Sequence, residues 1–255
     1  MTTRPELSIV VPAFNEAANI GPVVERAAAH LETRGIDYEI HVVDDGSSDG
    51  TAGRIADVSA RFPRVTIVRH ARNRGYGAAI RSGLAASSGK HVLVSDGDGQ
   101  FAIERDLDAL WMRRGQADLV LGVRNPRSDP PLRRMAGWIY SRMLVRWLLG
   151  GRFRDVNCGF KLVARPVFEG MDLQSTGALI SAELLTRARL RGATFVEVNV
   201  AHGRRRYGRA TGLLPSVVIR MLRELVALRA SILGRDAAPE SGLRAECDAV
   251  ESASA

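Results

Sequence analysis

Two aspartates separated by a single glycine, Asp96 and Asp98, follow an apolar run that ends at residue 95. If the chain turns at Gly97, the two carboxylates converge and share a hard divalent cation through oxygen, and the side chain of Gln100 can add a carbonyl ligand. Mg²⁺ and Mn²⁺ both accept such ligands, so the sequence does not choose between them. The alternative is an Asp-Gly turn with solvated acids. Taken alone, the motif leaves both interpretations open.

A second acidic motif, Asp-Asp-Gly-Ser-Ser-Asp-Gly-Thr at residues 44–51, follows another apolar run. A carboxylate at a strand end accepts hydrogen bonds from a nucleobase or from ribose hydroxyls. Ser47 and Asp49 also offer N-caps for a following helix. Capping does not explain the adjacent Asp44 and Asp45, and we therefore interpret the motif as nucleotide-binding.

Strand and helix patterns alternate through the first half of the chain and must position these motifs. Strands are predicted at residues 7–11, 39–43, 65–68, 91–95 and 119–121, and helices at 18–31, 49–62, 77–86 and 106–114. This rhythm predicts an α/β fold, a mainly parallel sheet with helices on both faces. Ligands bind beyond the carboxyl ends of such strands, where both acidic motifs and residues 12–16 lie. The second half predicts helices at 132–149, 179–190 and 213–233, an extended segment at 155–163 and a strand at 194–200.

The bulk composition narrows the class of protein. The chain has 255 residues and a net charge of +8, which favours anionic partners such as nucleotides, lipid phosphates or nucleic acid. Its two cysteines lie far apart, so they form no disulfide framework or zinc spacing, and a reducing compartment is expected. No apolar leader opens the chain and no stretch of about 20 residues is free of charge, so no transmembrane helix is predicted.

Two common nucleotide motifs are excluded. Gly75-Tyr76-Gly77 follows a predicted strand but lacks the third glycine and the acidic residue of dinucleotide-binding enzymes, which argues against a Rossmann redox enzyme. No Gly-x-x-x-x-Gly-Lys-Ser/Thr segment exists, so the chain has no P-loop.

The successive motifs resemble those of family 2 inverting glycosyltransferases. They are Val-Pro-Ala-Phe-Asn-Glu at 11–16, Val-Asp-Asp-Gly-Ser-Ser-Asp-Gly-Thr at 43–51, Asn-Arg-Gly-Tyr-Gly at 73–77 and Asp-Gly-Asp-Gly-Gln at 96–100. Segments 122–124, 155–161 and 205–208 are similar to the polyprenyl-phosphate (dolichyl-phosphate) mannose synthase branch. The likeness covers roughly residues 7–230, in order, and implies a nucleotide-diphospho-sugar transferase fold of the GT-A type.

The resemblance also implies roles for individual residues. It places the donor nucleotide against Pro12, Ala13, Phe14, Glu16, Val43 and Asp45. It places Mg²⁺ or Mn²⁺ on Asp96 and Asp98 with Gln100, around the turn at Gly97, and it directs Arg124 and Arg205 at the donor diphosphate or the acceptor phosphate. The family has Gly-x-Ser-Lys where this chain has Gly-Arg-Ala-Thr at 208–211. The phosphate-contacting lysine is therefore missing, which leaves the acceptor open.

The nature of the acceptor decides whether a base is needed. A phosphate oxygen is anionic at neutral pH and needs little general-base help, whereas a hydroxyl acceptor requires a positioned base. The candidates for such a base are Asp155 and Glu183. The alternative for Glu183 is an ordinary acid on the surface of a helix.

Positive charge gathers in three places. The predicted helices at 132–149 and 213–233 interleave arginines with large apolar residues, a pattern typical of helices that lie on a membrane surface. The alternative is that they pack on the core or on a second subunit, so a homo-oligomer stays open. The arginines within 204–209 favour phosphate over nucleic acid, because aromatic residues for base stacking are sparse there. We therefore expect a cytoplasmic protein, peripheral on the inner face of the membrane, with no nucleic-acid partner.

The expected organisation is one transferase domain over residues 1–234, with a donor-binding half at 7–124, an acceptor-binding half at 125–234 and a disordered tail at 235–255. The expected activity is metal-dependent transfer of a hexose, mannose or glucose, from a GDP- or UDP-sugar to a polyprenyl phosphate with inversion. Two alternatives remain. One is a soluble transferase that uses a hydroxyl acceptor in polysaccharide or natural-product assembly, and the other is a catalytically inactive transferase fold that acts as a binding protein.

Overall fold

The computed structural model describes residues 4–125, 135, 153–205, 207, 221 and 223–230. The strands in these residues are β1 (Leu7–Ala13), β2 (Tyr38–Asp44), β3 (Val65–Arg69), β4 (His91–Val94), β5 (Leu119–Arg124), β6 (Lys161–Ala164) and β7 (Phe195–Val200). The helices are α1 (Ile20–Arg34), α2 (Thr51–Arg61), α3 (Tyr76–Ala86), α4 (Ile103–Trp111), α7 (Arg165–Phe168) and α8 (Ile180–Leu190).

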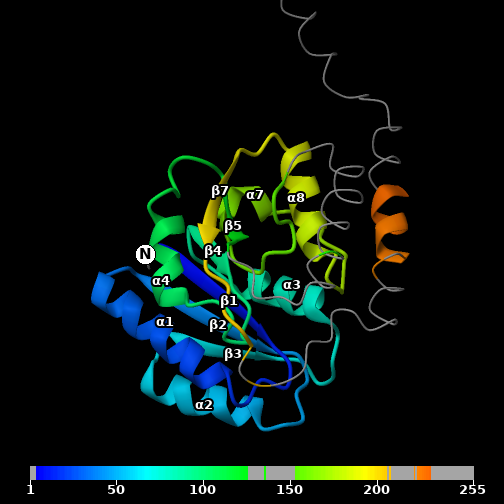
Figure 1. The fold of residues 1–255 in the computed structure, drawn as a ribbon. Coiled ribbons are helices and arrows are strands. Elements are labelled where there is room, and N and C mark those ends of the chain that lie inside the picture. The colour runs from blue at the N-terminus through cyan, green and yellow to red at the C-terminus, as the bar shows by residue number, and fades with distance from the viewer. Residues whose placement is uncertain are drawn as a thin grey trace, which may run out of the picture.

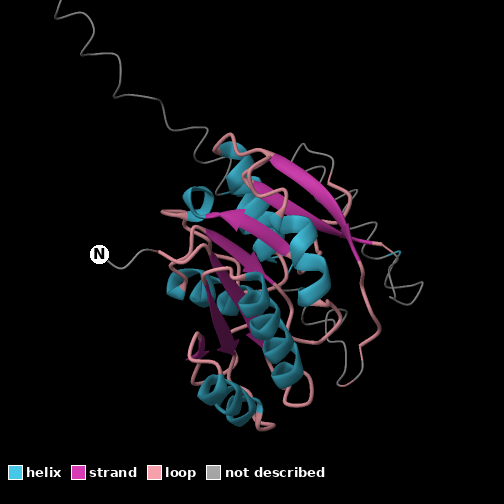
Figure 2. Ribbon diagram, turned by 90° about the vertical axis from the view of Figure 1, so that its left-hand side faces the viewer, coloured by secondary structure: helices cyan, strands magenta, loops and turns pink. Residues whose placement is uncertain are grey.

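The described strands form one twisted sheet in the order β3-β2-β1-β4-β6-β5-β7 (Figures 1 and 2). Strand β1 lies between β2 and β4 and runs parallel to both. Strand β6 is antiparallel to its two neighbours, β4 and β5. The expected α/β fold with a mainly parallel sheet is confirmed, and β6 is its one reversed strand among the described residues.

Helices cover both faces of the sheet, as expected (Figure 1). The core on one face joins alternate residues of β1, such as Ile9 and Val11, to apolar side chains of α1, α2 and α4. The core on the other face joins Val10 to α3, α7 and α8. The period of two along β1 therefore separates the two cores, as strand geometry requires.

The structure moves several expected boundaries. Strand β1 continues through Pro12 to Ala13, and α4 begins at Ile103 rather than at residue 106. Of the extended segment expected at 155–163, only the last residues join the sheet, in β6. Helix α7 then begins at Arg165, with Pro166 in its first turn, where proline is tolerated.

Part of the expected helix at 213–233 is described, and it is helical at 221 and 223–230. Leu225 and Leu228 are buried in the core that contains α3 and α8, while Val226 is exposed. One side of this segment therefore packs on the domain. Within the described residues, no helix has the length and apolarity needed to cross a membrane. The expected helix at 132–149, apart from residue 135, and the tail at 235–255 lie outside them.

Candidate active site

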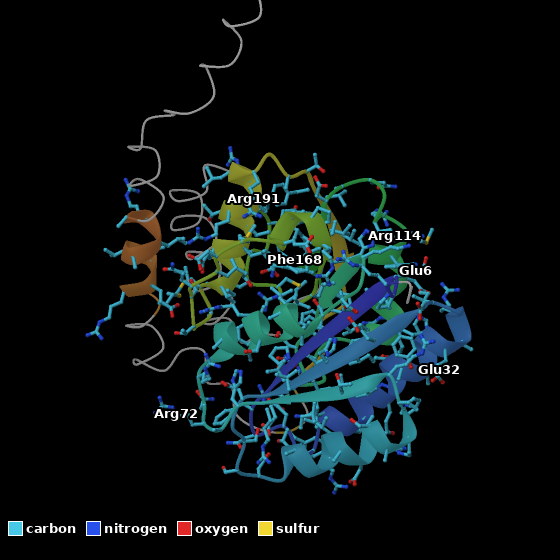
Figure 3. The ribbon with its side chains drawn as sticks, turned by 180° about the vertical axis from the view of Figure 1, so that it is seen from behind. Glu6, Glu32, Arg72, Arg114, Phe168 and Arg191 are labelled. Atoms are coloured by element: carbon cyan, nitrogen blue, oxygen red, sulfur yellow. The ribbon has the colours of Figure 1, made fainter. Side chains whose placement is uncertain are left out.

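The residues predicted to bind the nucleotide and the metal lie at or after the carboxyl ends of β1, β2 and β4, except Arg205, which follows β7. Glu6 precedes β1 and Arg72 follows β3, so in Figure 3 these two labels mark the opposite ends of the parallel strands. The acidic motifs lie at the end that Arg72 marks, because β2 closes at Asp44 and β4 at Val94. This is the edge where open parallel sheets bind ligands.

The segment after β1 is fixed by the motif after β2. The backbone N–H groups of Asn15 and Glu16 donate to the hydroxyls of Ser47 and Thr51, each at 2.9 Å. In return, the Ser48 N–H donates to the side-chain oxygen of Asn15 at 2.9 Å. Asn15 has a positive φ of 56°, a conformation that asparagine tolerates better than most residues. The two motifs therefore form a single folded unit, in which Phe14 stays 44% exposed.

Both aspartates of the 44–51 motif are buried and engaged with the protein. Asp45 accepts hydrogen bonds from His70 Nδ1 at 2.6 Å and from the backbone N–H groups of Arg74 and Gly75 at 2.9 and 2.8 Å. Asp44 accepts the Ser47 N–H at 2.9 Å and lies 3.4 Å from Arg69 Nε. Asp45 thus anchors the loop before α3, in addition to the nucleotide contact expected of it.

The remaining residues predicted to contact the nucleotide differ in exposure. Pro12, Ala13 and Val43 are buried within the sheet, whereas Phe14 faces solvent. An exposed aromatic ring at the binding edge of a sheet is suited to stacking on a base. Of the three buried residues, Ala13 and Val43 belong to the cores on opposite faces of the sheet, so they fix the strand ends that carry the motifs.

Asp96 and Asp98 lie just beyond β4 and influence each other. Burial, followed by the nearby Asp96 carboxylate, raises the pKa of Asp98 to about 6. Asp98 Oδ1 accepts the Gln100 N–H at 3.0 Å, and Asp96 Oδ1 accepts the Tyr76 hydroxyl at 2.7 Å. A Cβ at Gly97 would lie 3.0 Å from the Pro12 carbonyl oxygen, so the turn packs closely on β1.

The segment after β7 brings Arg205 to this pair. Its guanidinium is ion-paired with Glu16 and lies 3.4 Å from Asp98 Oδ2. Gln100 positions the segment through two hydrogen bonds to Gly203. The side-chain amide of Gln100 donates to the Gly203 carbonyl at 3.0 Å, and the backbone carbonyl of Gln100 accepts the Gly203 N–H at 2.8 Å. Burial raises the pKa of Glu16 despite hydrogen bonds from Asn19 and Arg205. Predicted donor and metal residues from both halves of the chain therefore meet here.

Arg124 and Asp155 form a buried two-point ion pair. Arg124 Nε and Nη2 donate to the two carboxylate oxygens of Asp155 at 2.7 and 2.8 Å. The ammonium of Lys161 lies close by, donating to the Cys158 carbonyl and to Ser181 Oγ, the latter at 3.2 Å. Burial lowers the pKa of Lys161, and the negative charges of Asp155 and Asp96 partly offset this lowering. Asp155 is therefore engaged in holding Arg124, a role different from that of a base.

Glu183 is not on the helix surface. It is 1% exposed, and it accepts hydrogen bonds from the Gln174 and Ser175 N–H groups at 3.0 and 2.7 Å and from Arg187 Nε at 2.8 Å. Its carboxylate stabilises the loop before α8. No described contact joins it to Asp96 or Asp98, so the structure does not bring this predicted residue to the others.

The oxygen donors at the end of β4 suit a hard divalent cation. Asp96 and Asp98 are partly buried, the Asp96 carboxylate disfavours the charge of Asp98, and a cation would relieve this repulsion. In the described residues no cluster of three or more His, Cys, Asp or Glu side chains could hold a metal, so further ligands would come from Gln100, water or the substrate. This pattern, few protein ligands plus phosphate oxygens, is typical of Mg²⁺ and Mn²⁺ sites in phosphate chemistry.

Comparison with known proteins identifies the family. The family model described as glycosyl transferase family 2 matches residues 8–170. The chain belongs to glycosyl transferase family 2. The matched range contains both acidic motifs and extends through α7, so it covers most of the site of this family 2 chain.

Several curated proteins are similar to this family 2 chain. A dolichyl-phosphate beta-glucosyltransferase of Trichomonas vaginalis is 30% identical over 214 residues, 76% of this chain and 62% of that protein. A dodecaprenyl-phosphate galacturonate synthase of Rhizobium johnstonii is 32% identical over 172 residues, 66% of this chain and 50% of that protein. A dolichol-phosphate mannosyltransferase of Mycosarcoma maydis is 28% identical over 238 residues, 89% of this chain and 80% of that protein. The chain thus spans less than two thirds of the length of the first two relatives.

Solved structures support the same fold. Glucosyl-3-phosphoglycerate synthase from Mycobacterium tuberculosis, crystallised with Mn²⁺, uridine diphosphate and phosphoglyceric acid, is similar with a TM-score of 0.68 and 23% identity. The alignment covers 93% of this chain and 81% of that chain. This likeness establishes the GT-A-type arrangement of the sheet and its helices.

The structure adds site residues that the sequence interpretation missed. Tyr76 contacts Asp96 directly, and Asn19 donates to Glu16 Oε2 at 2.6 Å. Gly159 lies so close to Asp96 that a Cβ there would come within 2.1 Å of Oδ2. The glycines around Tyr76 and the glycine in segment 155–161 were the available signals, because glycine marks close backbone approach.

Proposed function

We propose that this chain transfers a hexose, mannose or glucose, from a GDP- or UDP-sugar to a polyprenyl phosphate, with inversion and with Mg²⁺ or Mn²⁺. The observation that carries the proposal is the partly buried pair Asp96 and Asp98 at the end of a central parallel strand, with Arg205 and Glu16 beside it. The names of the polyprenyl-phosphate sugar transferases to which the chain is similar support the acceptor class.

The donor would lie across the ends of β1, β2 and β4. Phe14 offers a ring to the base, and Asp96, Asp98 and Gln100 would hold the metal. When bound, the metal supplies positive charge that stabilises the departing diphosphate. Arg205 already lies between two carboxylates, and its planar guanidinium is suited to the oxygens of the donor diphosphate.

The two carboxylates considered as a general base are both committed elsewhere. Asp155 holds Arg124 through both oxygens, and Glu183 accepts two backbone N–H groups and an arginine. An acceptor that needs no base fits these contacts better than a hydroxyl. A phosphate acceptor is such a nucleophile, and Arg124, held in place by Asp155, is a suitable contact for it.

Peripheral contact with the inner face of the membrane is part of the proposal, since a polyprenyl phosphate is presented at a lipid surface. The basic, apolar pattern at 132–149 supports it. The division into a donor half at 7–124 and an acceptor half at 125–234 is proposed on the same grounds.

The test is a transfer assay. Purified protein is incubated with Mg²⁺ or Mn²⁺, a labelled GDP- or UDP-hexose, and either undecaprenyl phosphate or a soluble hydroxyl acceptor, with Asp98→Asn as the inactive control. We expect label in the organic extract only when the lipid phosphate, the metal and the wild-type chain are all present. Transfer to the hydroxyl acceptor alone would favour the soluble alternative. Donor binding without transfer to either acceptor would favour the binding-protein alternative.

A further inference from the structure

Tyr76 is a polar side chain at the site that no step above uses. It is the first residue of α3, and its hydroxyl donates to Asp96 Oδ1 at 2.7 Å. An ionised carboxylate can only accept hydrogen bonds, so the phenol is the donor in this contact.

The two glycines that flank Tyr76 explain how the ring reaches this position. Gly75 has φ 101° and ψ 158°, a conformation that is essentially restricted to glycine. A Cβ at Gly77 would lie 2.5 Å from the Ser175 carbonyl oxygen, so the helix begins in close contact with that loop. The Gly-Tyr-Gly sequence is thus the end of the connection from β3 and the start of α3, and it directs one side chain at Asp96.

Both sides of this connection are anchored. Before it, Asp45 accepts the Arg74 and Gly75 N–H groups. His70 lies between Asp45 and Ser82 of α3, with Nδ1 2.6 Å from Asp45 Oδ1 and Nε2 2.9 Å from Ser82 Oγ.

The Ser82–His70–Asp45 arrangement has the spacing of a hydrolytic triad. However, Ser82 lies within α3, where the backbone N–H groups are used by the helix and offer no oxyanion site. The Ser82–His70–Asp45 arrangement therefore stabilises the loop before α3.

On the other side, the Gly77 N–H donates to the Thr176 carbonyl at 2.8 Å. The loop that contains Thr176 is held by two buried or partly buried acids. Glu183 accepts the Ser175 N–H at 2.7 Å, and Glu224 accepts the Thr176 and Gly177 N–H groups at 2.9 and 3.0 Å. The position of Tyr76 is therefore determined from two directions.

Asp96 has a second close neighbour, Gly159. Gly159 lies against its carboxylate, and a Cβ at this glycine would lie only 2.1 Å from Oδ2 and 2.6 Å from Oδ1. A carboxylate between a hydroxyl donor and a close backbone has little freedom to rotate. Such outer contacts orient metal ligands and affect the affinity for the metal by about ten- to a hundredfold.

We propose that Tyr76 is a positioning residue of the metal site, which orients Asp96 so that the carboxylate is preorganised for the divalent cation. The inference rests on the proposed function, because it requires that Asp96 bind the metal.

The experiment measures Mn²⁺ affinity directly, by electron paramagnetic resonance of free Mn²⁺, with GDP or UDP present and no acceptor. Tyr76→Phe removes only the hydroxyl. The matched control is Tyr38→Phe, because Tyr38 also donates to a carboxylate, Glu32 Oε1 at 3.3 Å, away from the site. Melting temperatures of both variants are recorded.

The expected result is an Mn²⁺ dissociation constant about tenfold higher for Tyr76→Phe, with Tyr38→Phe unchanged and both variants folded. In the transfer assay, excess Mn²⁺ should restore much of the turnover of Tyr76→Phe at unchanged melting temperature. If Tyr76→Phe does not fold, Gly159→Ala displaces the same carboxylate and should weaken Mn²⁺ binding by a similar factor.

The outcomes separate the two ideas. In one outcome the wild-type chain binds Mn²⁺, Asp98→Asn does not, and Tyr76→Phe binds Mn²⁺ with the same affinity as the wild-type chain. This outcome overturns the positioning role and leaves the proposed function standing. If Tyr76→Phe does not fold, an unchanged Mn²⁺ affinity in Gly159→Ala likewise overturns the positioning role. Failure of the wild-type chain to bind Mn²⁺ with either nucleotide overturns both.

Discussion

The guanidinium of Arg205 is ion-paired with the carboxylate of Glu16, 189 residues earlier in the chain, and also lies 3.4 Å from Asp98. One side chain therefore joins the segment after β7 to the segments after β1 and β4. Its guanidinium places a positive charge between these two acids. Its planar group also suits the two oxygens of a diphosphate.

Replacing Arg205 with lysine should lower kcat/KM about a hundredfold, because a point charge cannot reproduce the two-point geometry and a lost oxyanion donor costs about that much. Initial rates of hexose transfer measure this. Arg64→Lys is the control, since Arg64 pairs with Asp37 at 2.6 Å outside the site. Equal kcat/KM for Arg205→Lys and the wild-type chain would contradict the assigned role.

Glu183→Gln should act on stability rather than on chemistry. Removing one member of a buried ion pair costs about 3–5 kcal/mol, because Arg187, 7% exposed, is left without its charge partner. Urea unfolding should show this loss, while the kcat of the folded protein falls less than about tenfold. Abolished turnover with normal stability and normal donor binding would instead identify Glu183 as a base.

Two glycines near the nucleotide motif should respond in opposite ways to alanine. Gly46 has φ 73°, and a Cβ there would lie 2.4 Å from the Arg72 backbone, so Gly46→Ala should destabilise the protein by about 2–4 kcal/mol. Gly53 lies in α2 with open space around it, so Gly53→Ala should stabilise by about 0.5–1 kcal/mol. Thermal unfolding compares the two; a shift of the same sign in both variants would contradict the prediction.

Stability should fall at acid pH partly through Glu39. Burial alone would raise the pKa of Glu39, but the His41 ring, 3.3 Å from Oε1, and hydrogen bonds from Ser8 and Ser88 lower it to about 2. A lowered pKa in the folded state means that the contribution is complete above about pH 4.5 and is lost as the pH falls toward 2. Urea unfolding at several pH values should show a shallower acid slope for Glu39→Gln than for the wild-type chain. Parallel slopes would rule out this contribution.

Much of the fold was predictable because its signals are local. The apolar runs of β1, β2 and β4 end directly before the acidic motifs, so strand position and site position were predicted together. The reversed direction of β6 was not predicted, since nothing within its four residues specifies the neighbour or the direction of a strand. These depend on contacts with distant segments.

The site shows the same division. Asp96, Asp98 and Arg205 are indicated by their place among motifs that resemble those of family 2, whereas the partners of Glu183 and Asp155 are not indicated by the sequence. Glu183 has the helical spacing of a surface acid, and its burial results from a loop whose backbone N–H groups it accepts. The contact of Tyr76 with Asp96 depends on backbone geometry at Gly75, which a sequence pattern indicates only as a glycine.

The place of β6 between β4 and β5 has a consequence for synthesis of the chain. Strand β5 is complete at Arg124, yet among the described strands its neighbours are β6 and β7, which the ribosome makes later. Until residue 164 has emerged, β4 has an unpaired edge and β5 has no sheet to join. The nascent chain therefore exposes a strand edge at the centre of its future sheet, the kind of surface that promotes aggregation and on which chaperones act.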